Sequence, residues 1–255
     1  MIIYNGPSMI DPATNIVVIA RDQSSNRKTG NMIQTYILVR DTDPRLANKT
    51  GADFAICGKC RHRGQATDDP KRKLAVGRTC YVNIAQGVLI VWQSFQRGKY
   101  ETITGHDDIA AIGAGRIVRL GTYGDPAAVP GYIWDSLLSR AKGRTGYSHQ
   151  LNQPGADVRP DLCMISADTI EEATAAWDRG FRTFRTIPIK STLAETLAQI
   201  DRSRETLCPA SDEAGKRVQC EACKLCSGSG LSAKSIAIPM HDAGSNNRKK
   251  GRAYA

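Results

Sequence analysis

Strand-like and helix-like patterns alternate through the second half of the chain, and this alternation limits the folds that the sequence can form. Short apolar runs predict strands, and longer amphipathic stretches between capping residues predict helices. The expected strands are 116–124, 161–166, 181–187 and 234–240, and the expected helices are 129–143, 168–180 and 192–204. Strands that alternate with helices of this length indicate βαβ units and therefore a mostly parallel sheet.

The first half of the chain adds further strand candidates. The runs 15–20, 33–40 and 88–93 are short and rich in β-branched residues, which is typical of strands. With about eight strands in total, we expect an α/β protein with a mostly parallel sheet that closes into a degenerate (β/α)8 barrel of the TIM type. An open, doubly wound sheet is the alternative.

The length and composition favour one domain. A chain of 255 residues with 41% hydrophobic side chains can bury a sizeable core. We expect a single α/β domain over 1–243, with metal-stapled loops at 57–80 and 208–226. The polar and basic segment 244–255 is expected to be a disordered tail.

The charge balance points to a polyanionic partner. Lysine and arginine number 35 against 25 acidic residues, and the formal net charge is +10. This excess favours nucleic acid, although an ordinary basic surface would give the same count. No apolar run reaches the roughly 18 residues of a membrane span, and the N-terminus lacks a signal-peptide pattern. We therefore expect a cytoplasmic protein, in which closely spaced cysteines indicate metal binding more than disulfides.

Four cysteines near the C-terminus have the spacing C-x11-C-x2-C-x2-C; they are Cys208, Cys220, Cys223 and Cys226. Four thiolates at about 2.3 Å from one ion form a tetrahedral zinc site with no open position. Zinc is therefore the expected metal. An iron–sulfur cluster and unliganded thiols are the alternatives, and His241 lies close enough in sequence to replace one cysteine.

A second ligand set lies in the first half of the chain. Cys57, Cys60, His62 and Cys80 supply three sulfurs and one imidazole for a second possible zinc. The alternative is a pair of buried structural cysteines with His62 in solvent. A zinc ion closed by four protein ligands organises loops and does not activate water, so the catalytic groups are expected elsewhere.

In a parallel β/α architecture the chemistry is expected where strands end and loops begin. Asp125 follows the strand 116–124 directly and is the first candidate for a nucleophile or a general base. Tyr123 and Gly124 beside it are candidates for substrate binding. An Asp-Pro turn that begins a helix would explain the same aspartate without chemistry.

Further candidates follow other strands, and their convergence at one sheet edge is what would make them a site. They are His149, Ser166, Asp168, Arg185, Asp212, His241 and Asp242. Within the polar loop 21–31, Arg27 and Lys28 could hold phosphate, although the loop lacks the spacing of a P-loop.

Three strings, "SSNRKTGNMIQTYIL", "GTYGDPAAVP" and "CPASDEAGKRVQCEACKLC", resemble a group of bacteriophage proteins. More remotely, a β/α barrel with a late cysteine-rich loop resembles the tRNA-guanine transglycosylases and their phage relatives that insert 7-deazaguanine bases into DNA. The zinc pattern of that family, C-x-C-x2-C followed by a distant histidine, occurs here in altered form, and its glycine-rich substrate motif is not found.

In that family an aspartate attacks the anomeric carbon, guanine leaves, and the modified base joins the same carbon. The resemblance therefore implies a DNA-modifying base-exchange transglycosylase with Asp125 as nucleophile, Asp212 as the second choice, and a structural zinc. It also implies DNA, more than RNA, and a 7-deazaguanine base as partners in the cytoplasm of the host cell. A non-enzymatic, zinc-stabilised phage nucleic-acid-binding protein is the main alternative. An iron–sulfur enzyme that uses Cys57, Cys60 and Cys80 is the third hypothesis.

Overall fold

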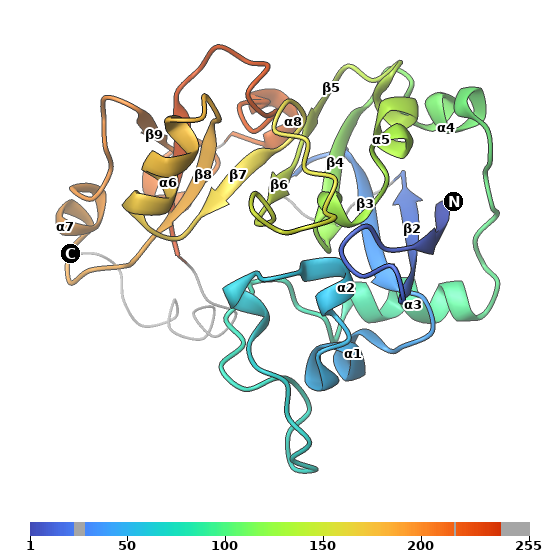
Figure 1. Cartoon of the computed structure of the whole chain (residues 1–255). Coiled ribbons are helices and arrows are strands. Elements are labelled where there is room, and N and C mark those ends of the chain that lie inside the picture. Colours follow the sequence, from blue (N-terminus) through green and yellow to red (C-terminus); the bar gives the residue numbers. More distant parts are fainter. Residues whose placement is uncertain (23–28, 217, 241–255) are drawn as a thin grey trace.

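Two five-stranded sheets organise the protein. The computed structural model describes residues 1–22, 29–216 and 218–240 (Figure 1). The first sheet has the order β1-β2-β3-β4-β5. Its strands are β1 (Ile2–Pro7), β2 (Asn15–Arg21), β3 (Ile33–Val39), β4 (Ile117–Tyr123) and β5 (Gly143–Thr145). The strands β1 to β3 pair antiparallel, whereas β3, β4 and β5 pair parallel.

The second sheet is parallel throughout and has the order β6-β7-β8-β10-β9. Its strands are β6 (Tyr147–Ser148), β7 (Met164–Ala167), β8 (Thr183–Ile187), β9 (Glu205–Leu207) and β10 (Ser235–Pro239). The last strand in the sequence, β10, lies between β8 and β9. This order places the C-terminal part of the described chain inside the sheet.

The two sheets meet at Gly146, between β5 and β6 (Figure 1). The strand β5 pairs with β4, and one residue later β6 pairs with β7. Gly146 donates its N–H to the Cys226 carbonyl at 3.1 Å, and its own carbonyl accepts the N–H of Met164 at 2.9 Å. A Cβ atom at Gly146 would lie 2.6 Å from the Cys163 sulfur, so only glycine fits without movement.

The chain is therefore a mixed α/β protein with mostly parallel pairing, as the sequence predicts. The predicted closed barrel is not found among the described strands, because they form two open sheets. The physical reason lies in the first half of the chain. The strands β1 to β3 follow one another with antiparallel pairing, so they supply no β/α units with which to close a barrel.

The helices surround these sheets. They are α1 (Pro44–Thr50), α2 (Phe54–Cys57), α3 (Gly87–Gln96), α4 (His106–Gly113), α5 (Gly131–Leu138), α6 (Ile170–Trp177), α7 (Leu193–Leu197) and α8 (Cys220–Cys223). Three short 3₁₀ helices are η1 (Arg61–Arg63), η2 (Pro126–Ala128) and η3 (Asp212–Ala214). None of the helices in the described part of the chain is long and apolar enough to span a membrane.

The three predicted helices are confirmed as α5, α6 and α7, in shorter form. Thr169 accepts the N–H of Glu172 at the start of α6 and so caps this helix. A full capping box forms at α7 between Thr192 and Glu195.

The predicted strand 88–93 is wrong, because these residues form α3. Val88 and Val91 are buried whereas Ile90 is 56% exposed. A spacing of three between the buried residues is the helical pattern, and here it outweighs the β-branched composition.

The protein has a large core and a small one. The large core packs the apolar residues of the first sheet against α2, α3 and α5. The small core lies in the second sheet and consists of Met164, Cys208, Cys226 and Ile236. Two of these four residues are cysteines, so thiols form part of the packing of this small core.

We predict that Gly146→Ala destabilises the protein, because the new methyl group would overlap the Cys163 sulfur. Overpacking of this kind costs about 1–3 kcal/mol. Urea unfolding followed by circular dichroism measures the change. Gly87→Ala is the matched control, because a Cβ atom there meets nothing within 4 Å. Equal stability of both variants would contradict this role of Gly146.

Candidate metal centre

Several predicted residues lie at the ends of neighbouring parallel strands. Asp125 follows β4, His149 follows β6 and Asp168 follows β7. Thr186 lies near the end of β8. Because carboxyl ends of parallel strands meet at one edge, these side chains share that edge. Convergence at one edge is the condition that the sequence sets for a site, and His149 and Asp168 lie together there.

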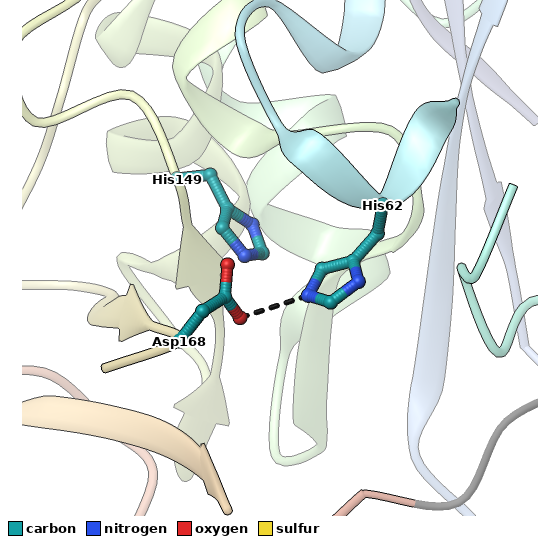
Figure 2. Close-up of side chains that lie close together, drawn as sticks. All are labelled: His62, His149 and Asp168. Atoms are coloured by element: carbon teal, nitrogen blue, oxygen red, sulfur yellow. Dashed lines mark hydrogen bonds and ion pairs between the residues drawn. The ribbon is translucent and has the colours of Figure 1, made fainter. Parts of the chain in front are cut away.

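His62, His149 and Asp168 form the centre of this cluster. Their ligand atoms all lie within 4.8 Å of one another, and no other such group of at least three occurs in the described residues. Figure 2 shows both imidazole rings near the Asp168 carboxylate. The Nε2 atom of His62 lies 2.8 Å from Oδ1 of Asp168, and the two rings are 5.8 Å apart at an angle of 71°.

His62 comes from a distant part of the chain and is held from two sides. It lies in η1, and its Nδ1 atom is 2.8 Å from the hydroxyl oxygen of Thr79. Its carbonyl oxygen accepts the N–H groups of Thr79 at 3.1 Å and Cys80 at 3.0 Å. The contact with Thr79 fixes the ring so that Nε2 faces Asp168.

Asp168 is an anchored carboxylate. Its Oδ1 also accepts the hydroxyl of Thr186 at 3.0 Å, and its Oδ2 lies 3.1 Å from Nε of Arg61. Arg61 in turn binds Glu172, whose carboxylate accepts the Asp168 N–H at 2.7 Å. Burial alone would raise the pKa of Asp168, but the hydrogen bond from His62, the nearby imidazoles and the Thr186 hydroxyl together lower it to about 2. The group is therefore ionised at neutral pH.

His149 is the buried member of the group. Burial lowers its pKa below the usual value, against the opposing effect of the Asp125 and Asp168 charges. The imidazole is therefore neutral at pH 7 and has a lone pair available for a metal or a proton.

The buried Asp125 accepts hydrogen bonds from the segments that form this edge. Its Oδ1 accepts the N–H of Ala127 at 3.0 Å, which caps η2. Its Oδ2 accepts the N–H of His149 at 2.8 Å and Nε2 of Gln150 at 3.1 Å. With both oxygens bonded and the residue 7% exposed, Asp125 positions the backbone of His149.

The two neighbours of Asp125 pack into the interior. Tyr123 belongs to the large core. Gly124 has a φ of +80°, and a Cβ atom there would lie 2.7 Å from the Cβ of Ile37. A tight backbone turn therefore requires this glycine.

Other predicted residues lie outside the group. Arg185 forms a buried ion pair with Glu205 at 2.6 Å. Asp212 begins η3, between β9 and α8, and is not part of the group. Arg27, Lys28, His241, Asp242 and the tail 244–255 lie outside the described residues.

The first cysteine set lies beside the histidine–aspartate group. Cys57 ends α2, Cys60 precedes η1, and Cys80 donates its N–H to the carbonyl of His62. The thiol of Cys60 accepts the N–H of His62, but burial dominates and raises its pKa to about 12. His62 does not turn toward these sulfurs as predicted, because its ring atoms face Thr79 and Asp168.

The second cysteine set lies beside the small core. Cys208 follows β9, Cys220 and Cys223 bound α8, and Cys226 accepts the N–H of Gly146 at 3.1 Å. None of the eight cysteines forms a disulfide within the described residues.

In neither set do three sulfurs lie within 4.8 Å of one another. A tetrahedral zinc site needs sulfurs separated by about 3.8 Å, since each lies about 2.3 Å from the metal. The sulfurs are thus more widely spaced than bound zinc requires, and zinc binding at both sets stays a prediction.

No protein-family model matches the chain, and no curated protein or solved structure is similar to it. The site must therefore be interpreted from its own geometry.

The sequence patterns include every member of the central group but do not join them. They place His62 with the cysteines, and Asp168 is one strand-end residue among several. The available signal was the position of His149 and Asp168 directly after successive strands.

We predict that Asp125→Asn destabilises the protein by about 1–3 kcal/mol, because the amide would direct N–H groups at N–H donors and leave buried groups unpaired. Chemical unfolding measures the loss. Asp107→Asn is the control, since its side chain is 80% exposed, and it should change stability by less than about 0.5 kcal/mol. An Asp125→Asn variant as stable as the control would exclude the positioning role.

Proposed function

We propose that the protein is a metal-dependent enzyme that acts on nucleic acid, with His62, His149 and Asp168 as the metal ligands. One observation carries the proposal: two imidazoles and one carboxylate converge at the carboxyl edge of a parallel sheet. Catalytic sites of α/β sheets commonly lie at this edge.

The ligand set is of the catalytic kind. Two histidines and one carboxylate suit zinc or ferrous iron, and three protein ligands leave a coordination position for substrate or water. A divalent metal bound there would supply Lewis acidity. The four-cysteine sets, in contrast, would close the coordination shell.

The groups around the ligands support this assignment. Metal-binding histidines usually hydrogen-bond through the second ring nitrogen, and Thr79 is placed to do this for His62. Thr186 and Arg61 hold the Asp168 carboxylate in the same way. Asp168 contributes the negative charge, and His149 contributes a neutral imidazole.

The substrate class follows from charge near the site. The segment between His62 and Thr79 includes a loop that is closed by the antiparallel Gln65–Val76 bridge and extends away from the body in Figure 1. Its tip carries three exposed basic residues, Lys71, Arg72 and Lys73. Together with the net charge of +10, this loop fits a phosphate backbone.

The second candidate function is the exchange of guanine for a 7-deazaguanine base. The observation that favours it is an ionised aspartate beside a neutral histidine at the strand ends, as a nucleophile and a base require. Asp168 would then be the nucleophile, because its carboxylate lies beside the imidazoles, whereas Asp125 is buried and holds the backbone N–H groups of Ala127 and His149. The predicted phage origin of the protein accords with either reaction.

We predict that His149→Ala and Asp168→Ala each lose about one equivalent of bound metal. His106→Ala is the matched control, because His106 lies in α4 and contacts Ser136 instead. Metal analysis of protein loaded with zinc, ferrous iron or cobalt gives the stoichiometry. The cobalt spectrum separates this nitrogen and oxygen site from any thiolate site.

Cleavage or modification of single- and double-stranded DNA with each metal tests the activity. Loss of activity in both variants, with the control active, is the expected result. Unchanged metal content in both variants would overturn the metal assignment. A metal-independent activity that labels Asp168 with a sugar would favour base exchange.

We also predict that replacing Lys71, Arg72 and Lys73 by glutamine weakens DNA binding and reduces the salt dependence. The slope of log K against log salt should fall by about 2 to 3, since each lost cation releases fewer counterions. Fluorescence anisotropy at several salt concentrations measures the slope. Arg97→Gln with Lys99→Gln is the control on another exposed turn. An unchanged slope would show that the loop does not bind the phosphate backbone.

A further inference from the structure

Four cysteines lie near the junction of the two sheets. Cys208 and Cys226 are buried together in the small core, where Tyr147 packs against them. Cys208 donates its N–H to the carbonyl of Ala237 in β10 at 2.8 Å, and the carbonyl of Cys226 accepts the N–H of Gly146 at 3.1 Å. Burial raises the pKa of both thiols, and the neighbouring thiols, Cys220 and Cys223 among them, raise it further. Two chain segments thus supply four thiols near the small core, with their sulfurs more widely spaced than in a zinc-bound site.

A buried cation lies next to these thiols. Arg119 in β4 is only 9% exposed. Its Nη2 donates to the hydroxyl of Tyr81 at 3.1 Å, and its guanidinium lies 5.7 Å from the ring of Tyr147. Its Nε has no hydrogen-bond partner among the described residues. No ion pair with a carboxylate is formed by Arg119 within the described ranges either.

The ionisable groups that interact with Arg119 identify the missing anion. They are three tyrosines, Tyr36, Tyr81 and Tyr147, and two cysteines, Cys220 and Cys226. Phenols and thiols are neutral at pH 7 in a buried setting, and a buried guanidinium without an anion is strongly unfavourable. Bound metal converts thiols into thiolates, and this supplies the negative charge.

Two other buried arginines show the contrast. Arg185 contacts the carboxylate of Glu205 through two nitrogens, at 2.8 and 2.6 Å. Arg182 donates to the backbone carbonyls of Gly228 and Lys234 at 2.9 and 2.7 Å. Within the described residues, Arg119 has neither a carboxylate nor a pair of carbonyls and donates to one phenol.

We propose that Cys208, Cys220, Cys223 and Cys226 bind metal as thiolates, and that Arg119 is the buried counter-ion of this anionic centre. Four thiolates around one divalent zinc leave a net charge of about −2, and Arg119 offsets part of it. Tyr147 adds to the stabilisation, because its hydroxyl is hydrogen-bonded to the Cys226 sulfur. This centre is separate from the one held by His62.

Two metals share this ligand chemistry. Thiolates select zinc and iron–sulfur clusters alike. The sulfurs would have to draw together around a single zinc, whereas the cysteines of an iron–sulfur cluster bind different iron atoms and lie further apart. Metal analysis distinguishes the two, and either result fits an anionic centre.

The first experiment assigns the metal to these cysteines. Full-length protein is purified without oxygen, and its zinc, iron and acid-labile sulfide are measured. The variant with Cys220→Ser and Cys223→Ser should lack metal that the wild type holds, whereas Cys163→Ser should keep it. Zinc alone identifies a mononuclear centre, and iron with sulfide identifies a cluster. Equal metal content in the wild type and the double variant would overturn the proposal.

The second experiment tests the counter-ion. Arg119→Met should weaken metal retention against a competing chelator by about tenfold or more, and Arg119→Lys should restore most of it because the charge is kept. Tyr147→Phe is the second variant, and it should shift the thiolate-to-metal absorption band by removing one hydrogen bond to sulfur. If Arg119→Met retains metal as well as the wild type does, the counter-ion role is wrong. If Arg119→Met does not fold, an Arg119→Lys variant with unchanged metal retention supports the role, and one that loses metal tenfold contradicts it.

Discussion

The packing at Gly146 is the constraint on which the arrangement of this protein depends. A single chain segment leaves the first sheet at β5 and enters the second at β6, with one residue between them. That residue has no room for a side chain, because Cys163 lies against it. Its two backbone hydrogen bonds also connect the segments that contain Cys226 and Met164. The two sheets are therefore fixed to each other by close contact as well as by chain connection.

The candidate metal centre follows from this junction. The strand β4 pairs parallel with β5, and β7 pairs parallel with β6, one residue further along the same segment, so the residues after β4, β6 and β7 lie at one edge. Asp125 then connects the segments after β4 and β6, because its carboxylate accepts an N–H group from each of them. His62 enters from the segment after α2, and Thr79 fixes its ring. Asp125, which the sequence predicts to be a nucleophile, thus holds the backbone of His149 in place. His149, together with His62 and Asp168, carries the proposed chemistry.

The buried arginines of this protein differ in the groups that neutralise their charge. Arg185 and Glu205 neutralise each other within the second sheet, and Asp53 does the same with Arg63 near α2. Arg119 has no such carboxylate in the described residues and lies beside thiols. The two proposed centres therefore differ in their ligands. The centre at the strand ends has nitrogen and oxygen ligands, and the centre near Gly146 has sulfur ligands.

The sequence by itself determined the local elements whose signals are short in range. The cap at Thr169, the capping box at Thr192 and the apolar strands of the second sheet follow from neighbouring residues, so pattern and propensity suffice. It also placed Asp125, His149 and Asp168 directly after strands. Residues 88–93 misled the prediction because composition favours a strand, whereas the burial of Val88 and Val91 against the core favours a helix.

Only the tertiary structure decided which residues meet. Two open sheets form in place of one barrel, because β5 pairs with β4 whereas β6, one residue later, pairs with β7. Strand closure is a long-range property that no local pattern specifies. The contact of His62 with Asp168 joins residues 106 positions apart. The proximity of Arg119 to Cys220 and Cys226 is likewise set by packing. Sequence spacing named the ligands, and the fold decided their partners, because hydrogen bonds and charges act through space.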